Sequence, residues 1–378
     1  MSLRLYLTLL MGKSVPEPVP SLLLDALQRI EVTVSDGSRD GFQIVFSVGR
    51  SGLADASEYT LLESPLVKPF NRVIIMMGFG VVSRVLIDGI ITHQQLNPSS
   101  GMGKSTLTIT GEDLSVMMDL EEKTETFPNQ DDAAIVSKII SDYAQYDLIP
   151  KVITPDSMET PIENSVISSQ QATDLRYIKE LAGKYGHVFY IESADVPKVN
   201  TAYWGPPDRE GSPQKALSFN MGEFTNVDSI DFQMNALQQS TLTGSIQDTE
   251  QGEKFDIPPE LPNSRTQLAS QPITDVNSNI KISKQPRESG VSQTDVLTMA
   301  KTEANNGSED AVTATGKLDS IRYGDILKAR HLVTLRGAGQ SYNGLYYVKK
   351  VKHTITKETY KQEFTLTREG LGSTIQTV

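Results

Sequence analysis

The chain of 378 residues has no cysteine, only four histidines and a single tryptophan. Without cysteine it has no disulfide, no thiolate metal site and no cysteine nucleophile. No stretch approaches the roughly 18 uninterrupted apolar residues that a membrane span requires. The start, Met1–Thr8, alternates apolar and polar residues like a strand and lacks the features of an export signal. We therefore expect synthesis in a reducing compartment, without a membrane span.

Positive charge is also scarce, with 35 basic against 47 acidic residues and a formal net charge of −12. Such a chain repels nucleic acid and anionic lipid, and no long run of Lys and Arg offsets this. Direct nucleic-acid recognition is therefore not expected.

Residues 1–111 have the pattern of a small β-barrel or sandwich. Short segments alternate with period two and are separated by Gly, Pro, Asn or Asp. The expected strands are Leu3–Leu10, Ile30–Ser35, Phe42–Val48, Val73–Met77, Val85–Thr92 and Ser105–Thr110. We expect this first barrel to end at Gly111, where the pattern changes.

Residues 112–206 have the pattern of an inserted α/β domain. A short helix is expected around residues 114–118, and a second around residues 135–143 with Asn129 or Asp131 as its N-cap. A third spans residues 175–185, and Gly186 is placed to end it before a buried strand at residues 188–191.

The remainder is assigned to a second barrel, interrupted by a polar segment. Residues 207–240 and 307–371 carry the barrel pattern, residues 241–306 form a polar extended segment plus a helix, and residues 372–378 form a C-terminal tail. The expected elements are strands at 217–221, 228–234, 332–335, 345–353 and 362–367, and a helix at 294–304. Residues 241–292 are rich in Pro, Ser, Gln and Asn, a composition typical of disordered chains.

An internal similarity connects the two β-rich regions. Residues 104–114 align without gaps with residues 361–371 and are identical at five of eleven positions. Each copy closes a β-rich region and follows a strand that contains a histidine, His93 or His353. The similarity favours duplication of one barrel.

Three glycine-rich motifs imitate ligand-binding loops and fail on their details. The stretch at residues 101–106 has Pro98 where a phosphate loop needs glycine, and a strand follows it. The stretch at 73–83 ends in Ser83 instead of the third glycine of a dinucleotide fingerprint. The stretch at 36–47 ends in Ser47 where a calcium loop has glutamate. Turns explain all three, and we predict no cofactor.

No catalytic or metal constellation survives the same test. The four histidines are scattered, without a second ligand at metal-binding spacing. We therefore expect a protein that is not an enzyme. The candidate histidines are His93, His187, His331 and His353.

The order of elements resembles the late control protein D family of phage baseplate hubs and the hub half of valine-glycine repeat spike proteins of type VI secretion. The resemblance consists of seven short sequence blocks. No block is specific by itself, but together they occur in the same order along nearly the whole chain. The blocks are Asp40–Phe46, Leu86–Thr92, Leu107–Leu114, Gln171–Tyr190, Tyr323–Val333, Tyr342–His353 and Tyr360–Arg368.

The resemblance implies a mainly β, α+β fold with two related small barrels per chain and the inserted domain between them. It further implies a homotrimer, in which six similar barrels form a pseudo-sixfold ring. Such a ring is a structural hub in the baseplate of a contractile injection system. It adapts the sixfold inner tube, or a tube-initiator protein, to a threefold spike and contacts other baseplate proteins.

On this interpretation the chain is made in the bacterial cytoplasm and incorporated into a phage tail or a tail-like injection particle. Acidic groups facing the channel would resist anionic cargo. Only seven residues follow Leu371, so we expect the spike to be a separate protein. The short tail is expected to dock on it, through Gly370, Leu371, Gly372, Ile375 and Val378.

A different class of function remains open, a monomeric β-rich module that binds glycan or cell wall. It requires exposed aromatic side chains at a groove, and Trp204 is the best candidate. The competing interpretation of Trp204 is a packing anchor in a proline-bounded loop.

Overall fold

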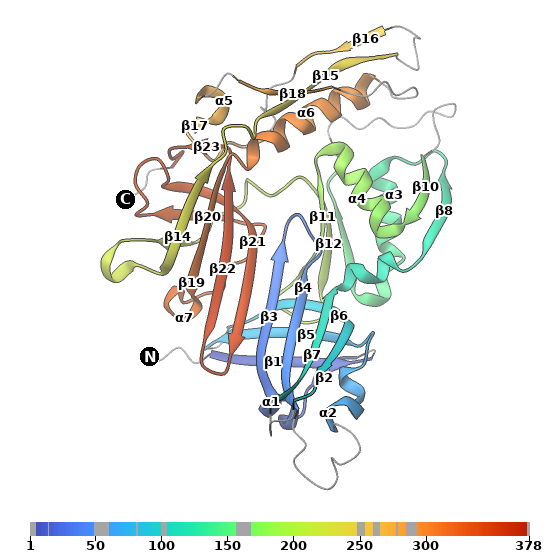
Figure 1. Ribbon diagram of the computed structural model, residues 1–378. Helices are drawn as coiled ribbons and strands as arrows, with labels where there is room; N and C mark the ends of the chain where they lie inside the picture. Colours follow the sequence, from blue (N-terminus) through green and yellow to red (C-terminus); the bar gives the residue numbers. More distant parts are fainter. Residues whose placement is uncertain are drawn as a thin grey trace.

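The computed structural model describes residues 5–13, 15–48, 60–80, 82–99, 104–155, 168–247, 254–259, 265–276, 279–284 and 293–375. The fold is mainly β, as expected, with a few helices beside a large antiparallel sheet (Figure 1). Short elements at its margins are β2 (Glu17–Pro18), α1 (Ser21–Ala26), α2 (Thr60–Glu63), η2 (Pro65–Val67), η4 (Ala144–Tyr146), η5 (Gly222–Phe224), α7 (Ser320–Tyr323) and β23 (Gly370–Leu371).

The first β unit contains all six strands predicted from the sequence. They are β1 (Leu5–Gly12), β3 (Leu27–Ser35), β4 (Gly41–Val48), β5 (Arg72–Phe79), β6 (Val82–Asn97) and β7 (Ser105–Asp113). Alternation decides which side chains face inward. In β7, Leu107 and Ile109 are fully buried, whereas Thr106, Thr108 and Thr110, which alternate with them, lie on the opposite face.

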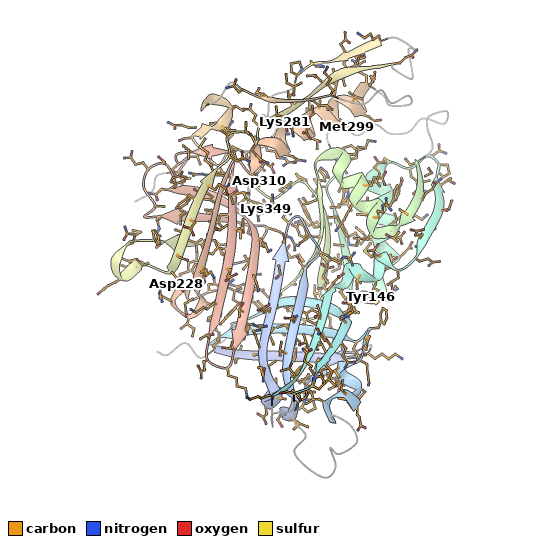
Figure 2. The ribbon with its side chains drawn as sticks, viewed as in Figure 1. Tyr146, Asp228, Lys281, Met299, Asp310 and Lys349 are labelled. Carbon is orange, nitrogen blue, oxygen red and sulfur yellow. The ribbon has the colours of Figure 1, made fainter. Side chains whose placement is uncertain are left out.

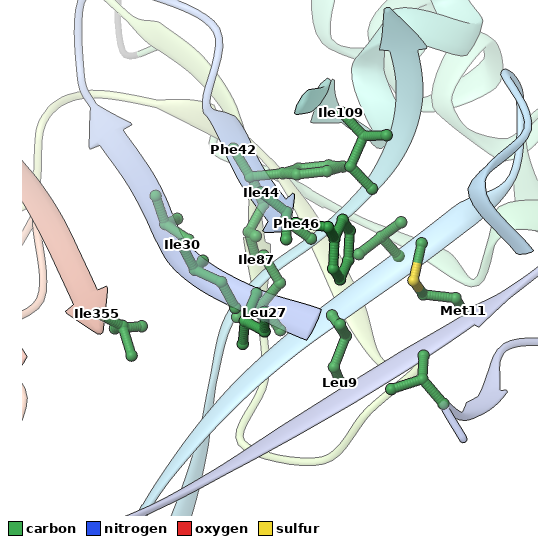
Figure 3. Close-up of a cluster of buried hydrophobic side chains, with 14 of the residues drawn as sticks. Leu9, Met11, Leu27, Ile30, Phe42, Ile44, Phe46, Ile87, Ile109 and Ile355 are labelled. Atoms are coloured by element: carbon green, nitrogen blue, oxygen red, sulfur yellow. The ribbon is translucent and has the colours of Figure 1, made fainter. Parts of the chain in front are cut away.

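The core of this unit is built from aliphatic and aromatic side chains (Figure 3). Phe46 and Ile44 of β4 and Ile30 of β3 are fully buried in it. Ile355, from near the C-terminus, belongs to the same cluster. The second β unit therefore contributes to the core of the first.

The second β unit also contains six strands. They are β13 (Gln214–Ser218), β14 (Val227–Met234), β19 (Val312–Asp319), β20 (Leu332–Arg336), β21 (Gly344–Thr356) and β22 (Tyr360–Arg368). Sequence reasoning missed β19, which puts Ala314 and Gly316 at inward positions. A Cβ on Gly316 would lie 2.5 Å from the ring of Phe364, so the strand needs small residues that weaken its hydrophobic pattern.

The two units share one strand order. In the first, neighbouring strands run β3-β4-β7-β6-β5-β1; in the second, β14-β19-β22-β21-β20-β13. Numbered along the chain within each unit, both orders are 2-3-6-5-4-1. The units differ in the last pairing, since β1 is antiparallel to β5 and β13 is parallel to β20. This shared topology supports the duplication inferred from the sequence.

The structure also corrects the register of the internal repeat. A one-residue bulge follows Leu27 in β3 and Val227 in β14, at the start of each strand. Counting across the sheet from these bulges matches Glu112 with Thr367, whereas the sequence alignment matches it with Glu369. Two residues are one period of a strand, so the sequence match kept the inward and outward faces but not the position.

The two units are joined edge to edge, and no closed barrel is found among the described residues. The second half of β21 pairs antiparallel with β3, which merges both units into one 13-stranded sheet. The two small barrels expected from the sequence therefore take the form of two open sheets, each curved around its own core. Within the described residues neither sheet closes on itself; instead, the edge strand β3 of the first unit pairs with β21 of the second unit.

The inserted α/β domain lies between the two units in the sequence. It contains η3 (Leu114–Asp119), β8 (Glu122–Phe127), α3 (Asp132–Ser141), β9 (Leu148–Val152), β10 (Ser168–Thr173), α4 (Asp174–Tyr185), β11 (Val188–Ser193) and β12 (Asn200–Gly205). The helix boundaries follow the predicted signals. The carboxylate of Asp131 accepts a hydrogen bond from the Ala134 amide (2.7 Å), and Gly186 ends α4 in a left-handed conformation.

The polar segment is folded where it is described, contrary to its composition. Its elements are β15 (Ser240–Gln247), β16 (Lys254–Ile257), β17 (Gln271–Pro272), α5 (Ile273–Val276), β18 (Lys281–Lys284) and α6 (Gln293–Glu309), and they form an arm above the second unit (Figure 1). Val296 and Ala300 of α6 are fully buried against Leu242 and Ile246 of β15. A small apolar core from the segment itself therefore orders it.

Candidate assembly interfaces

The motifs that imitate ligand loops prove to be ordinary turns and strands where they are described. Residues 101–103 lie outside the described part, and β7 follows them as a strand. Gly80 adopts a left-handed conformation (φ 63°) between β5 and β6. In the described part of the chain, no three His, Asp or Glu side chains are grouped to hold a metal ion.

The four histidines lie apart: His93 and His353 on strands β6 and β21, His187 and His331 in the connections before β11 and β20. His93 is exposed on β6, and His331 is half-buried. His187 packs edge-on against the ring of Trp204 (4.5 Å), and burial lowers its pKa to about 4. Burial lowers the pKa of His353 to about 3, and its Nδ1 lies 2.8 Å from the hydroxyl of Tyr360. Because burial lowers their pKa values, His187 and His353 are neutral residues that serve in packing.

Trp204 is a packing anchor, which corrects the alternative of an exposed binding aromatic. Its side chain is fully buried on β12, and its Nε1 donates a hydrogen bond to the carbonyl oxygen of Ile178 (3.2 Å). Tyr185 lies edge-on against it (5.9 Å). It is therefore not available to bind a glycan.

A buried ion pair fastens the two β units at their junction. Arg330, which precedes β20, donates hydrogen bonds through Nη2 to the carboxylate of Asp40 (2.7 Å) and to the carbonyl oxygen of Ser35 (2.8 Å). Its guanidinium lies over the ring of Tyr190 from the inserted domain (4.1 Å). One side chain thus connects all three parts of the chain.

The electrostatics of this pair reflect its burial. Burial raises the pKa of Asp40 to about 7, although Arg330 stabilises the ionised carboxylate and by itself lowers this pKa. The neighbouring carboxylate of Asp113 accepts a hydrogen bond from the Asp40 amide and also raises the Asp40 pKa. Burial disfavours the charge of Arg330, but Asp40 outweighs this and raises the arginine pKa. Removing either partner would leave an uncompensated buried charge.

A second buried cluster fixes the inserted domain to the first unit. Arg72 of β5 binds the carboxylate of Asp88 through Nε (2.8 Å) and Nη2 (2.7 Å). Its Nη1 donates to Asp147 (2.8 Å) of the inserted domain, and Asn200 of β12 donates to Asp88 (3.0 Å). This fork geometry holds the two parts in a single orientation.

The junction also contains a small, partly open cavity of about 60 Å³. Charged side chains from both units line it, among them Asp40, Asp88, Asp113, Arg84 and Arg330. Asp40, Asp88 and Arg330 are engaged in the ion pairs described above. The cavity is therefore a gap left between interlocked parts, smaller than a typical ligand pocket.

The arm is anchored by a third buried cluster. The carboxylate of Glu369 accepts hydrogen bonds from Arg209 (3.1 Å) and from the amides of Leu268 and Ala269. At the base of the arm, Lys349 of β21 pairs with Asp310, and Figure 2 shows both side chains where the arm meets the second unit. These contacts hold the arm within its own chain.

The predicted docking tail is largely engaged inside the chain. Gly370 and Leu371 form β23, which pairs with β17 of the arm, and the Gly372 amide donates to the Ser341 carbonyl (2.9 Å). Ile375 is the partly exposed member, with 37% of its surface accessible. Val378 lies outside the described residues.

β14 and the second half of β6 each leave one strand edge open in the described sheet. β14 pairs with β19 on one side, and no described strand pairs with its other side. β6 pairs with β7 throughout its second half, and beyond Ile91 no described strand pairs with its other side. Such edges are where a sheet is extended by another chain. The alternating pattern of the sequence predicts strands at these places but does not indicate that they lie at edges.

No helix in the described part of the chain is both long enough and apolar enough to cross a membrane.

Solved structures with the same fold are components of phage tails and of type VI secretion. A tail protein from Neisseria meningitidis MC58 superposes with a TM-score of 0.65 at 12% identity, over 97% of this chain and 98% of that one. The 43 kDa tail protein of prophage MuSo2 from Shewanella oneidensis gives 0.64 at 11% identity, over 97% and 99%. The E. coli c3393 protein, a type VI secretion component with structural similarity to the T4 tail proteins gp27 and gp5, gives 0.55 at 12% identity, over 90% and 73%.

At the level of sequence, no curated protein matches the chain. One sequence family does match, over residues 48–357, which is most of the chain. The chain belongs to the Alg8 N-terminal domain family.

Proposed function

We propose that this protein is a trimeric hub in the baseplate of a contractile injection system. In this role it joins a sixfold inner tube to a threefold spike, and it acts through assembly, not catalysis. The observation that carries the proposal is the repeated strand order, 2-3-6-5-4-1 in both β units of one chain. Three chains then supply six related units around one axis, which is what a connection between sixfold and threefold partners needs.

The fold comparison points in the same direction. Whole-chain superposition on phage tail proteins accounts for both units and the inserted domain together. The resemblance of the sequence to late control protein D hubs rests on the same succession of elements. The locked junctions give the chain the rigidity that an adaptor between two large partners requires.

The outward face of the merged sheet is suited to line a channel. It is rich in threonine and carries opposite charges in equal number. Its cations are Arg29, Lys317, Lys350, Lys352 and Lys361, and its anions are Glu31, Glu112, Asp231, Asp319 and Glu363. Several pair directly, as Lys317 does with Glu363 (2.7 Å). A channel lined by this face would be nearly neutral, and the acidic excess of the chain would lie elsewhere.

The tail retains a narrower role than the sequence indicated. Gly370, Leu371 and Gly372 hold the chain's own arm, so we propose that spike docking falls to the residues from Ile375 onward. Deleting residues 375–378 should remove spike recruitment and leave the ring intact. Retained recruitment would refute this assignment.

Native mass spectrometry of the chain purified with the tail proteins made beside it tests the function. The expected result is a species with three copies of the 41.5 kDa chain, carrying tube and spike components. A monomer without tail-like partners at any ionic strength would refute the hub assignment.

A further inference from the structure

The junction between the two β units of one chain provides a template for a junction between chains. Residues 350–356 of β21 pair antiparallel with residues 29–35 of β3. β21 is the fifth strand of the second unit, and β3 is the second strand of the first unit. A junction between two chains can be built in the same way if the two units exchange roles. The fifth strand then comes from the first unit and is β6, and the second strand comes from the second unit and is β14. Both of these strands have an open edge among the described residues.

Independent backbone features establish which residues are equivalent. Phe70 and Arg330 both precede the fourth strand of their unit and both have positive φ angles, 64° and 66°. The Phe70 amide donates to the carbonyl of Ile91 (2.8 Å), and the Arg330 amide donates to that of Val348 (2.7 Å). A left-handed conformation is uncommon for residues other than glycine, so its repetition in the same hydrogen-bonded position fixes the correspondence.

The bulges give the same correspondence. In the fifth strands, one bulge lies between Ile91 and His93 and the other between Val348 and Lys350. His93 therefore corresponds to Lys350. The bulge after Leu27 corresponds to the one after Val227, as described above, so β3 and β14 are offset by 200 residues.

We infer that β14 of one copy pairs antiparallel with the second half of β6 of another copy. The internal register, carried over residue by residue, gives three pairs on the outward face. These pairs are His93 with Asn235, Gln95 with Gln233, and Asn97 with Asp231. The pairing extends one sheet through successive chains, and it is head to tail because two different edges meet.

The side chains at these edges fit burial by another chain. Leu96 of β6 and Phe232 of β14 face each other in this register, and both are half-buried apolar residues next to separate cores. Their equivalents at the internal junction, His353 and Val32, form a pair that is almost completely buried. Pairing would bury the inter-chain pair in the same way.

A second contact flanks the proposed pairing. At the internal junction Arg330 reaches the carbonyl of Ser35 in the other unit. The equivalent of Arg330 is Phe70, which is 58% exposed, and the equivalent of Ser35 is Asn235, two residues before Leu237, which is 80% exposed. Phe70 of one copy therefore faces the corner at Leu237 of the next, so that an apolar contact replaces the hydrogen bond between Arg330 and Ser35.

That the pairing closes at three copies rests on the proposed function. The pairing itself can be tested separately because the chain contains no cysteine. In the internal junction the Asp36 amide donates to the Lys349 carbonyl (2.9 Å), so Ser35 and Lys350 are a non-hydrogen-bonded pair. Lys352 and Thr33, two residues further along, are a pair of the same type, and Gln95 and Gln233 are their inter-chain equivalents. The Cα atoms of such a pair are close enough for a disulfide between cysteines at these positions.

The experiment oxidises the assembled Gln95→Cys/Gln233→Cys chain and separates the products on a non-reducing gel. Gln95→Cys/Ser229→Cys, displaced by four residues, is the register control. Thr33→Cys/Lys352→Cys is the positive control, because these residues pair inside one chain. We expect most Gln95→Cys/Gln233→Cys chains in covalent oligomers that end at the trimer, at least tenfold more than with the displaced pair. The positive control should close without a change in mass.

The outcomes separate the inference from the proposed function. A ladder that continues beyond three copies would support the pairing and refute the three-copy ring. Trimers by native mass spectrometry with no covalent product, while the positive control closes, would refute the pairing and keep the ring. A chain that remains monomeric up to high micromolar concentration would refute both.

Discussion

Replacing Arg330 with methionine tests whether the junction between the two β units depends on one buried ion pair. The guanidinium contacts Asp40 at 2.7 Å and Ser35 at 2.8 Å, and both charged side chains are about 95% buried. Methionine fills much of the volume but leaves the Asp40 carboxylate without a cation and next to Asp113. Leaving one partner of a buried pair uncompensated costs about 3–5 kcal/mol.

Urea unfolding at pH 8 measures this loss, since at that pH Asp40 of the unsubstituted chain, with a pKa raised to about 7 by burial, is ionised and paired with Arg330. The matched control is Lys317→Met, which breaks an ion pair with Glu363 whose side chains are 60% and 47% exposed. Water screens exposed pairs, so the control should barely move the midpoint. The double variant Arg330→Met/Asp40→Leu removes both charges and should regain most of the lost stability.

Two results would refute this reasoning. One is a loss below about 1 kcal/mol for Arg330→Met, which would mean that Asp40 is not left charged and unpaired, because water solvates it or because it takes up a proton. The other is a double variant as unstable as the sum of the single ones, which would assign the loss to packing instead of charge.

Three further predictions concern other parts of the chain. His353, with its pKa lowered to about 3 by burial, binds a proton in the unfolded chain first, so stability should fall as pH drops from 6.5 toward 3. His353→Gln should flatten that decline in thermal unfolding measured across pH. Trp204→Ala should cost about 3–5 kcal/mol in urea unfolding, because the side chain is fully buried; an intact inserted domain with lost glycan binding would contradict the packing role. Phe70→Asp should weaken self-association at least tenfold in analytical ultracentrifugation with unchanged unfolding, as should Leu237→Asp. An unchanged association constant would contradict their place at the inter-chain contact.

The elements with strong local signals were predictable from the sequence. The six strands of the first unit alternate cleanly, and Asp131 and Gly186 mark helix ends through side-chain capping and a left-handed backbone. β19 escaped because Gly316 must be small beneath the ring of Phe364, a long-range requirement that erases the local pattern.

Long-range polar contacts were not predictable. Asp40 lies in a turn that imitates a calcium loop, and no feature of the sequence marks Arg330, which is 290 residues away in sequence. A burial preference is a property of a residue type, whereas an ion pair is a property of two positions that the fold brings together. The role of Trp204 was not predictable for the same reason. Whether it is a packing anchor or a binding residue depends on its exposure, which only the fold determines.

By itself, the sequence determined the mainly β class, the capping signals at Asp131 and Gly186, the lack of thiol chemistry and the signal of an internal repeat. Tertiary structure alone decided that the repeat has one strand order, that its register differs by two residues from the best alignment, and that the two units merge at β21 and β3. The physical reason is the period of a strand. Alternation tells which face a residue occupies, but hydrogen bonds between distant strands fix which residues are neighbours and which edges remain open.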